Sequence, residues 1–155
     1  MKAFTKVALV AALGLSAVGV MAGEISNTDI FATSARNEAV GDNSKAFQNI
    51  GVAKDSGRIL NSTIYGEYAT NTAYGANSTA KQHIGVAKEG GTLDHVNVFA
   101  SHAFNQAYGK DSTAVQKIGF AKNGTLKDVN IYAENAYNQA TGDHSVAKQK
   151  IGVVE

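Results

Sequence analysis

The chain reads Ser112-Thr113-Ala114-Val115-Gln116-Lys117-Ile118-Gly119 in the third of four similar stretches. The other three begin at Ser44, Ser78 and Ser145, and they keep Ser, Ala, Gln, Ile and Gly at the same places. The spacing is 34, 34 and 33 residues between the shared glutamines, which are Gln48, Gln82, Gln116 and Gln149. A fixed period of this length is the signature of a repeat protein.

Other residues recur with the same period and define the limits of each unit. An Ile or Val followed by an aromatic residue occurs once per repeat, at Phe31, Tyr65, Phe99 and Tyr132. The chain therefore divides into a leader, residues 1–22, and a single repeat domain, residues 23–155. The repeats are about 25–58, 59–92, 93–125 and 126–155. The third repeat is one residue shorter than the first two, because Asn123-Gly124-Thr125 stands where the second repeat has Glu89-Gly90-Gly91-Thr92. A deletion of this kind indicates an exposed turn.

The local pattern predicts strands within each repeat. Val96-Asn97-Val98-Phe99-Ala100 alternates with period two, as a half-buried strand does. Glycines stand where turns belong, as in Tyr108-Gly109-Lys110-Asp111. The period also fits helical arrays of the tetratricopeptide or ankyrin type, but the signature residues of those repeats are missing and the chain has no Pro. We therefore expect an all-β fold, a β-solenoid of four stacked coils with a period of 33–34 residues.

Comparison of the four copies separates the inside of each coil from the outside. Gln116 and Ile118 are kept in every copy and should face the core, whereas the position of Lys117 varies and should face solvent. The kept positions change parity across Gly119 and again within residues 100–103. A change of parity requires a bulge or a bend, so each coil should have several short faces.

Stacking of the coils predicts two ladders of amide side chains. Equivalent residues of neighbouring coils lie about 4.8 Å apart, and an inward amide can bond to the amides above and below it. The alternative for the glutamines is a row of solvated surface residues. One ladder consists of the four glutamines named above. The other consists of Asn37, Asn71, Asn105 and Asn138.

The first 22 residues read as a secretory signal peptide. Lys2 and Lys6 give a positive start, residues 7–21 form an apolar run, and Ala22 precedes the expected cleavage site. The alternative is a membrane-anchoring helix, for which the run is short. Loss of the two lysines takes the net charge from +1 to −1. We expect a secreted mature chain at the cell surface or in the extracellular space, with no membrane span.

The composition argues against catalysis and bound cofactors. Cys is absent, which excludes disulfides and thiolate sites, and the near-neutral charge gives no field that would attract nucleic acid. Acids recur in one turn of three repeats, but too sparsely for calcium. The histidines share no repeat position or metal spacing and are interpreted as surface residues; they are His83, His95, His102 and His144. We expect no enzyme activity, no catalytic residues, no metal and no cofactor.

The unit Ser-x-Ala-x-Gln-x-Ile-Gly, preceded by Asn-x-Ala-x-Gly, resembles the repeats of curlin-type subunits of bacterial functional-amyloid fibres. Residues 138–147 are also similar to pieces of trimeric autotransporter adhesin heads. The resemblance covers the whole mature chain, although its units are longer than those of curlins and contain fewer glutamines. It implies an extracellular β-solenoid that builds fibres for adhesion or biofilm.

The ends of the array also favour self-assembly. The first repeat begins at Ile25 and the last runs to Glu155, so we expect no segment that caps the terminal strands. Lys54, Lys88 and Lys122 share the position that Glu155 occupies in the fourth repeat. In a head-to-tail polymer, Glu155 would lie between Lys122 of its own chain and Lys54 of the next; the alternative is a solvated chain end.

The expected partners follow from this arrangement. They are further copies of the chain and, as a second candidate, a secretion or nucleation protein. The competing function is that of a monomeric extracellular β-solenoid that binds a glycan, a surface or ice.

Overall fold

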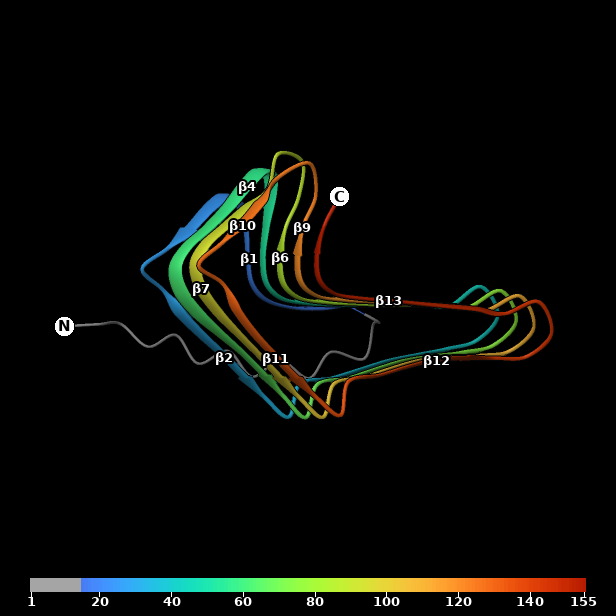
Figure 1. Ribbon diagram of the computed structural model, residues 1–155. Coiled ribbons are helices and arrows are strands. Elements are labelled where there is room, and N and C mark those ends of the chain that lie inside the picture. The colour runs from blue at the N-terminus through green and yellow to red at the C-terminus, as the bar shows by residue number, and fades with distance from the viewer. Residues whose placement is uncertain (1–14) are drawn as a thin grey trace.

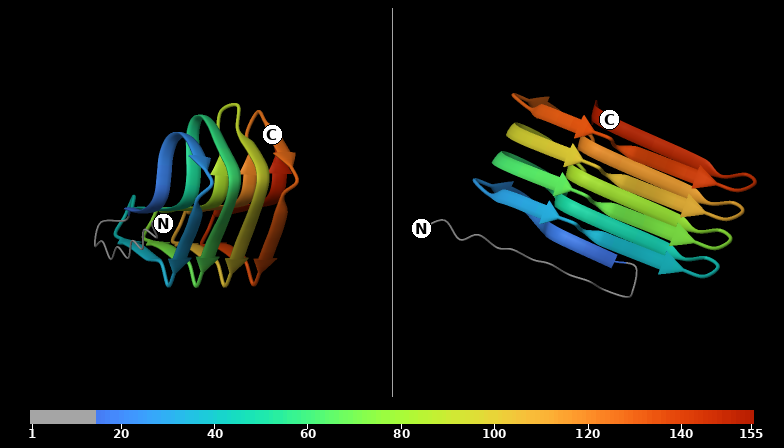
Figure 2. Two further views of the ribbon diagram at one scale, coloured as in Figure 1. Left: turned by 90° about the vertical axis from the view of Figure 1, so that its left-hand side faces the viewer. Right: turned by 90° about the horizontal axis from the view of Figure 1, so that it is seen from below.

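The computed structural model describes residues 15–155, without the side chains of residues 15–22 and Ser56. Every regular element in this range is a β-strand, and the range contains no helix. The chain winds in parallel coils that stack along one axis (Figure 1, Figure 2). The expectation of a β-solenoid with about four turns is therefore confirmed, and the helical array is excluded.

Each coil contains three or four strands. Coil 1 holds β2 (Asp29–Thr33), β3 (Arg36–Val40) and the first half of β4 (Lys45–Glu67). Coil 2 holds the second half of β4, β5 (Thr70–Tyr74) and β6 (Thr79–Ala87). Coil 3 holds β7 (Thr92–Ser101), β8 (Phe104–Tyr108) and β9 (Thr113–Ala121). Coil 4 holds β10 (Thr125–Lys127), β11 (Asn130–Glu134), β12 (Tyr137–Thr141) and β13 (Val146–Val154).

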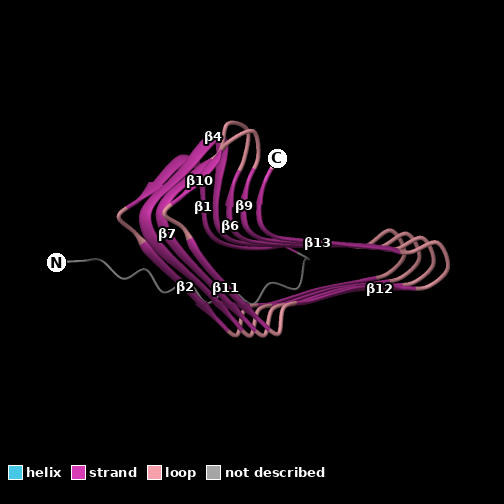
Figure 3. Cartoon of the chain, in the orientation of Figure 1, coloured by secondary structure: helices cyan, strands magenta, loops and turns pink. Residues whose placement is uncertain are grey.

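Two parallel sheets run along the stack. One has nine strands, with the order β10-β7-β4-β6-β9-β13 and with β1 (Leu15–Ser26), β2 and β11 attached; the other has the order β12-β8-β5-β3. The register pairs equivalent residues of successive repeats, for example Gln82 with Gln116. Seen along the axis, a coil has a narrow arm and a broader head, with loops at the tip of the arm and at the corners (Figure 3).

The two parts differ in thickness because their inward side chains differ in size. In the arm, small side chains let the two sheets approach closely; the buried ones are Ala46, Ala73, Ala80, Ala107 and Ala114. The head encloses branched residues such as Ile84, Leu93 and Val98, all of which are fully buried. The large apolar residues that the repeats share therefore determine where the main core lies.

Bends occur where the kept positions change parity. Gly51, Gly85, Gly119 and Gly152 turn the chain at the base of the arm with φ between 56° and 63°. A Cβ on Gly119 would lie 2.4 Å from Cδ1 of Ile131, so both the backbone and the packing require glycine there. Other bends use left-handed residues with side chains, including Asn61, His95 and Asp128. Asn, Asp and His are the side chains that tolerate this conformation best.

The predicted signal peptide lies partly outside the described residues, because residues 1–14 are not described. Residues 15–22 form most of β1 and pair in parallel with β4, with Ser16 opposite Gln48 and Val18 opposite Ile50. This strand lies on the coil 1 side of the stack, before the first repeat. Cleavage after Ala22 stays a prediction. Among residues 15–155 there is no helix with the length and apolar character needed to span a bilayer.

Candidate assembly interface

The four predicted glutamines lie in one row between the two sheets of the arm. In coils 2 to 4 the side-chain nitrogen donates to the side-chain oxygen of the preceding coil. The distances are 2.6 Å from Gln82 to Gln48, 2.7 Å from Gln116 to Gln82 and 2.5 Å from Gln149 to Gln116. The same nitrogens donate to backbone carbonyls across the arm; for Gln116 the acceptor is Ala103, at 2.9 Å. The row therefore links neighbouring coils to one another and the two sheets to each other.

The four predicted asparagines form a second row, and its hydrogen bonds run the opposite way. Nδ2 of Asn37, Asn71 and Asn105 donates at 2.7 Å in each case to Oδ1 of the asparagine in the following coil. Asn71 and Asn105 are completely buried. A shift of one residue in strand pairing would turn these amides outward, so the two rows fix the register of the stack.

A third row is aromatic and was not predicted from the sequence. Phe31, Tyr65, Phe99 and Tyr132 stack with ring centroids 4.8, 4.6 and 4.9 Å apart and with interplanar angles of 9° or less. The recurring aromatic position in each repeat was the available signal. Stacking of the coils at the strand spacing turns that recurrence into a continuous ladder.

The outer side of coil 4 is open in this structure. Coil 4 repeats the inward Gln and Ile of coil 3, but their exposure differs. Gln149 is exposed and Ile151 is 40% exposed, whereas Gln116 and Ile118 are fully buried. A hollow at this end is lined by core positions of coil 4, including Leu126, Val129, Ile131 and Gly152. The face therefore presents apolar groups and hydrogen-bonding groups in the arrangement that one coil offers to the next.

The charged row proposed for the subunit joint also follows the stack. Backbone hydrogen bonds place Lys88 and then Lys122 in successive coils after Lys54, and Glu155 comes next in the row. Within the single chain, the Glu155 carboxylate forms an ion pair with Lys150. The contact of Glu155 with Lys54 of a second copy stays a prediction.

The interpretation of all four histidines as surface residues is wrong for His83, which is only 9% exposed. Its Nδ1 lies 2.8 Å from Oδ1 of Asn49. Burial, together with the nearby charges of Lys88 and Lys117, lowers its pKa to about 3. His95, His102 and His144 instead occupy left-handed turn positions. The sequence did not indicate this burial because it depends on the bend at Gly85. The bend brings outward side chains that follow it, such as Lys88, against His83, which precedes it.

One group of side chains has the composition of a metal site. Asp94, His95 and Asp128 offer ligand atoms within 4.8 Å of one another. The ammonium of Lys127 already lies 3.5 Å from the Asp94 carboxylate and 3.8 Å from that of Asp128, and His95 Nδ1 is 2.7 Å from Asp94. Because a cationic side chain already balances the half-buried Asp94 and the exposed Asp128, we assign no metal to this group.

Comparisons with protein-family models, with curated proteins and with solved structures found no match to this chain. The resemblance to curlin-type repeats accordingly stays a prediction.

Proposed function

We propose that the mature chain is a secreted, non-enzymatic structural protein that assembles head to tail into extracellular fibres for adhesion or a biofilm matrix. Coil 4 of one copy would stack on coil 1 of the next, in the register that joins the coils within a chain. The resemblance of the repeat to curlin-type units supports the proposed role of the fibres.

The observation that carries the proposal is the residue-by-residue match between coil 4 and coil 1. Continuing the register would set Gln48 of the next copy on Gln149, Ile50 on Ile151 and Phe31 on Tyr132. Gln48 would donate to Gln149 as Gln82 donates to Gln48. The amide row, the core and the aromatic ladder would all continue across the joint without a change of geometry.

The charges at this joint are also compatible. In the internal contact between coils 3 and 4, Lys150 pairs with Lys117, which places like charges side by side. In the proposed joint, Lys150 would instead face Asn49 and Glu155 would face Lys54. A copy in the correct register therefore avoids the Lys–Lys contacts that exist inside the chain, which favours this joint over registers that create them.

The leader bears on when assembly would start. Residues 15–22 pair with the β4 edge that coil 4 of another copy would need. Removal of residues 1–22 would leave the backbone donors and acceptors of residues 47–54 open on that side, and an open parallel edge is a template for another strand. We therefore expect chain 23–155 to assemble and chain 1–155 to assemble more slowly.

The test is electron microscopy and sedimentation of chain 23–155, alone and with Ile151→Lys. The substitution places a charge on the open face, where water reaches it in the monomer but not in the joint. We expect unbranched fibres from chain 23–155 and none from the Ile151→Lys variant, with a β-type circular dichroism spectrum in both. Thr141→Lys, on an exposed outward position of the same coil, is the matched control and should still form fibres. A stable monomer of chain 23–155 would instead select the monomeric binding module.

A further inference from the structure

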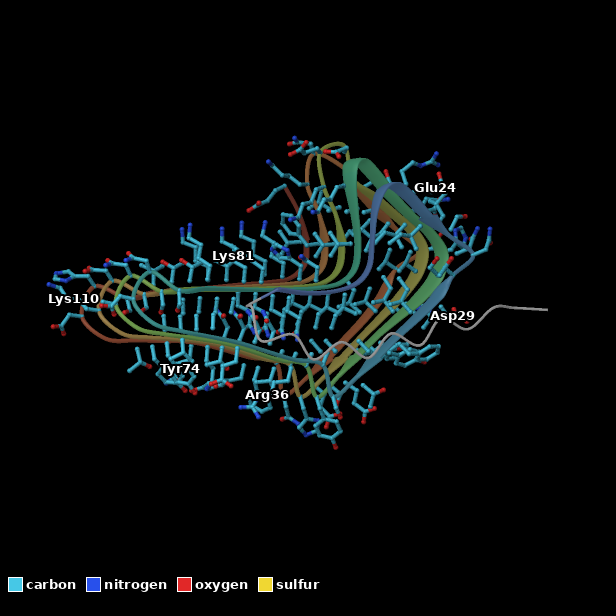
Figure 4. The ribbon with its side chains drawn as sticks, turned by 180° about the vertical axis from the view of Figure 1, so that it is seen from behind. Glu24, Asp29, Arg36, Tyr74, Lys81 and Lys110 are labelled. Atoms are coloured by element: carbon cyan, nitrogen blue, oxygen red, sulfur yellow. The ribbon has the colours of Figure 1, made fainter. Side chains whose placement is uncertain are left out.

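The bend at the base of the arm brings outward side chains of one coil together. The strand bends sharply at Gly85 and its equivalents, which have positive φ, as the paths of β9 and β13 show in Figure 1. Side chains from before and after the bend therefore meet: Nζ of Lys88 lies 3.4 Å from Nδ1 of His83. Val52, Val86 and Phe120 pack as a separate apolar cluster in the same angle. Figure 4 shows Lys81 on this side of the arm and Tyr74 on the opposite side.

Lysines from all four coils converge on this angle, which we call the lysine corner. Four of these lysines precede the bend and lie on the outward face of β6, β9 and β13. The other three follow the bend and form the row of Lys54, Lys88 and Lys122. The lysine corner consists of Lys54, Lys81, Lys88, Lys117, Lys122, Lys148 and Lys150. It holds half of the 14 lysines and arginines of a chain whose overall net charge is +1. Positive charge is therefore concentrated on one face of a protein that is close to neutral overall.

Burial and the close spacing of the lysines disfavour their protonated forms, and together they lower the pKa of two of them. Burial and then the charges of Lys54, Lys117 and Lys81 lower the pKa of Lys88. Burial and then the charges of Lys150 and Lys122 lower the pKa of Lys117. The Lys117 ammonium also lies 3.7 Å from the centroid of the buried Phe120 ring, which holds it in the angle.

Little negative charge faces these groups. Glu155 pairs with Lys150 at one end, and Glu89 lies near Lys88. No other ion pair to a lysine of this corner occurs among the described side chains. A closely spaced row of like charges repels itself, and a bound anion relieves that repulsion.

We propose that the lysine corner binds a linear acidic polysaccharide with one carboxylate or sulfate per sugar, lying along the axis of the solenoid. Coils repeat about every 4.8 Å, close to the advance of one sugar in an extended glycan, so successive lysines meet successive anionic groups. Single-stranded nucleic acid fits less well because its binding sites stack successive bases on exposed aromatic rings. Phe120 is fully buried beneath Lys117, and the half-buried Phe47 has no aromatic residue at its position in the other three coils. Because one chain supplies the row, this binding does not depend on fibre formation.

The test compares two variants that lose the same charge. Lys54→Gln with Lys88→Gln and Lys122→Gln removes the row after the bend. Lys45→Gln with Lys110→Gln and Lys127→Gln removes three lysines elsewhere. Binding is measured with a fluorescent polyuronate oligosaccharide at several salt concentrations, with neutral dextran and a DNA oligonucleotide of equal charge as comparison probes.

We expect the corner variant to lose at least about tenfold in affinity for the polyuronate and the control variant less than about twofold. Only lysines that contact the carboxylates of the bound sugar displace counterions from them, and the control lysines lie outside the corner. The dependence of binding on salt should weaken in the corner variant alone. An equal loss in both variants, tighter binding of DNA than of polyuronate, or binding of dextran would each overturn the proposal.

A second measurement needs no variant and so does not depend on how the variants fold. Nuclear magnetic resonance of the wild-type lysine amines follows the titration of Lys88 with and without the polyuronate. A bound carboxylate next to the ammonium should raise the pKa of Lys88, because an opposite charge favours the charged form. An unchanged titration at saturating polyuronate would show that the sugar binds elsewhere and would overturn the proposal.

Discussion

Coils 3 and 4 have almost the same inward residues and differ in how much of them is buried. Gln116, Ile118 and Ala121 are completely buried, whereas their equivalents Gln149, Ile151 and Val154 are exposed. The sequence of a coil therefore does not determine its burial; the neighbouring coil does. In a stack of this kind, stability is a sum of contributions from contacts between neighbours, and a coil with one neighbour has only part of it.

The largest expected difference between the two coils concerns the core. Ile118→Ala should lower the free energy of unfolding by about 2–5 kcal/mol, because it leaves a cavity between two coils. Ile151→Ala should cost about 1 kcal/mol or less, because its side chain is already partly in water. Urea unfolding of monomeric protein measures both. Equal losses would contradict the view that coil 4 lacks a covering neighbour.

A pH effect sharpens the comparison, since the position of His83 is filled by Lys117 and Lys150 in coils 3 and 4. The pKa of His83 is lowered from 6.5 to about 3, so the unfolded chain binds a proton that the folded chain does not. This contribution to stability is present above pH 6.5 and is lost as the pH falls. Unfolding at pH 5 should be about 2 kcal/mol easier than at pH 7.

His83→Asn, which copies Asn49 of coil 1, should remove most of this dependence on pH. His144→Asn changes an exposed histidine and should leave it intact. If both variants keep the full dependence, His83 is not the group responsible.

Substitutions in the amide row should also lower the free energy of unfolding more in coil 3 than in coil 4, with a smaller loss than at Ile118. Gln116→Leu leaves the Gln82 oxygen and the Ala103 carbonyl without their donor in a buried place, at a cost of about 1–3 kcal/mol. Gln149→Leu should cost about 1 kcal/mol in the monomer, because water can reach the site of its own exposed amide but the buried Gln116 oxygen still loses its donor. Thermal unfolding compares the two single variants.

The same row also makes a prediction about fibres. Gln82→Leu combined with Gln116→Leu should slow or abolish assembly, which light scattering would follow. The exposed Lys110→Ala should have no such effect. Similar assembly rates in the two proteins would mean that the amide row is not needed for the stack.

The smallest effect is expected at the charged end of coil 4. Glu155→Lys would place a lysine against Lys54 of the next copy, and an exposed ion pair of this kind contributes about 0–1 kcal/mol. Fibre growth should slow more at low salt than at high salt, because salt screens exposed charges. Unchanged growth at low ionic strength would exclude this joint and leave the solenoid unaffected.

Much of the interior could be predicted because the repeats can be compared with each other. Gln116 and Ile118 recur in every copy, and parallel stacking places recurring residues in contact. The bend at Gly119 was visible as a change of parity. The outer surface was harder to predict. The position shared by His83 and Lys117 varies between copies and was expected in solvent, yet His83 is only 9% exposed and the Lys117 ammonium lies over the Phe120 ring.

The period, the all-β character and the identity of the two amide rows follow from the amino-acid sequence, because hydrogen-bonded stacking requires the same residue at the same place in each coil. The size and direction of the bend at Gly85, in contrast, came from the three-dimensional structure. This angle buries His83, gathers the lysines and creates a surface with concentrated charge. Periodicity reports which residues share a face, but the angle between two faces depends on backbone conformation at the bend and on the size of the side chains packed inside it.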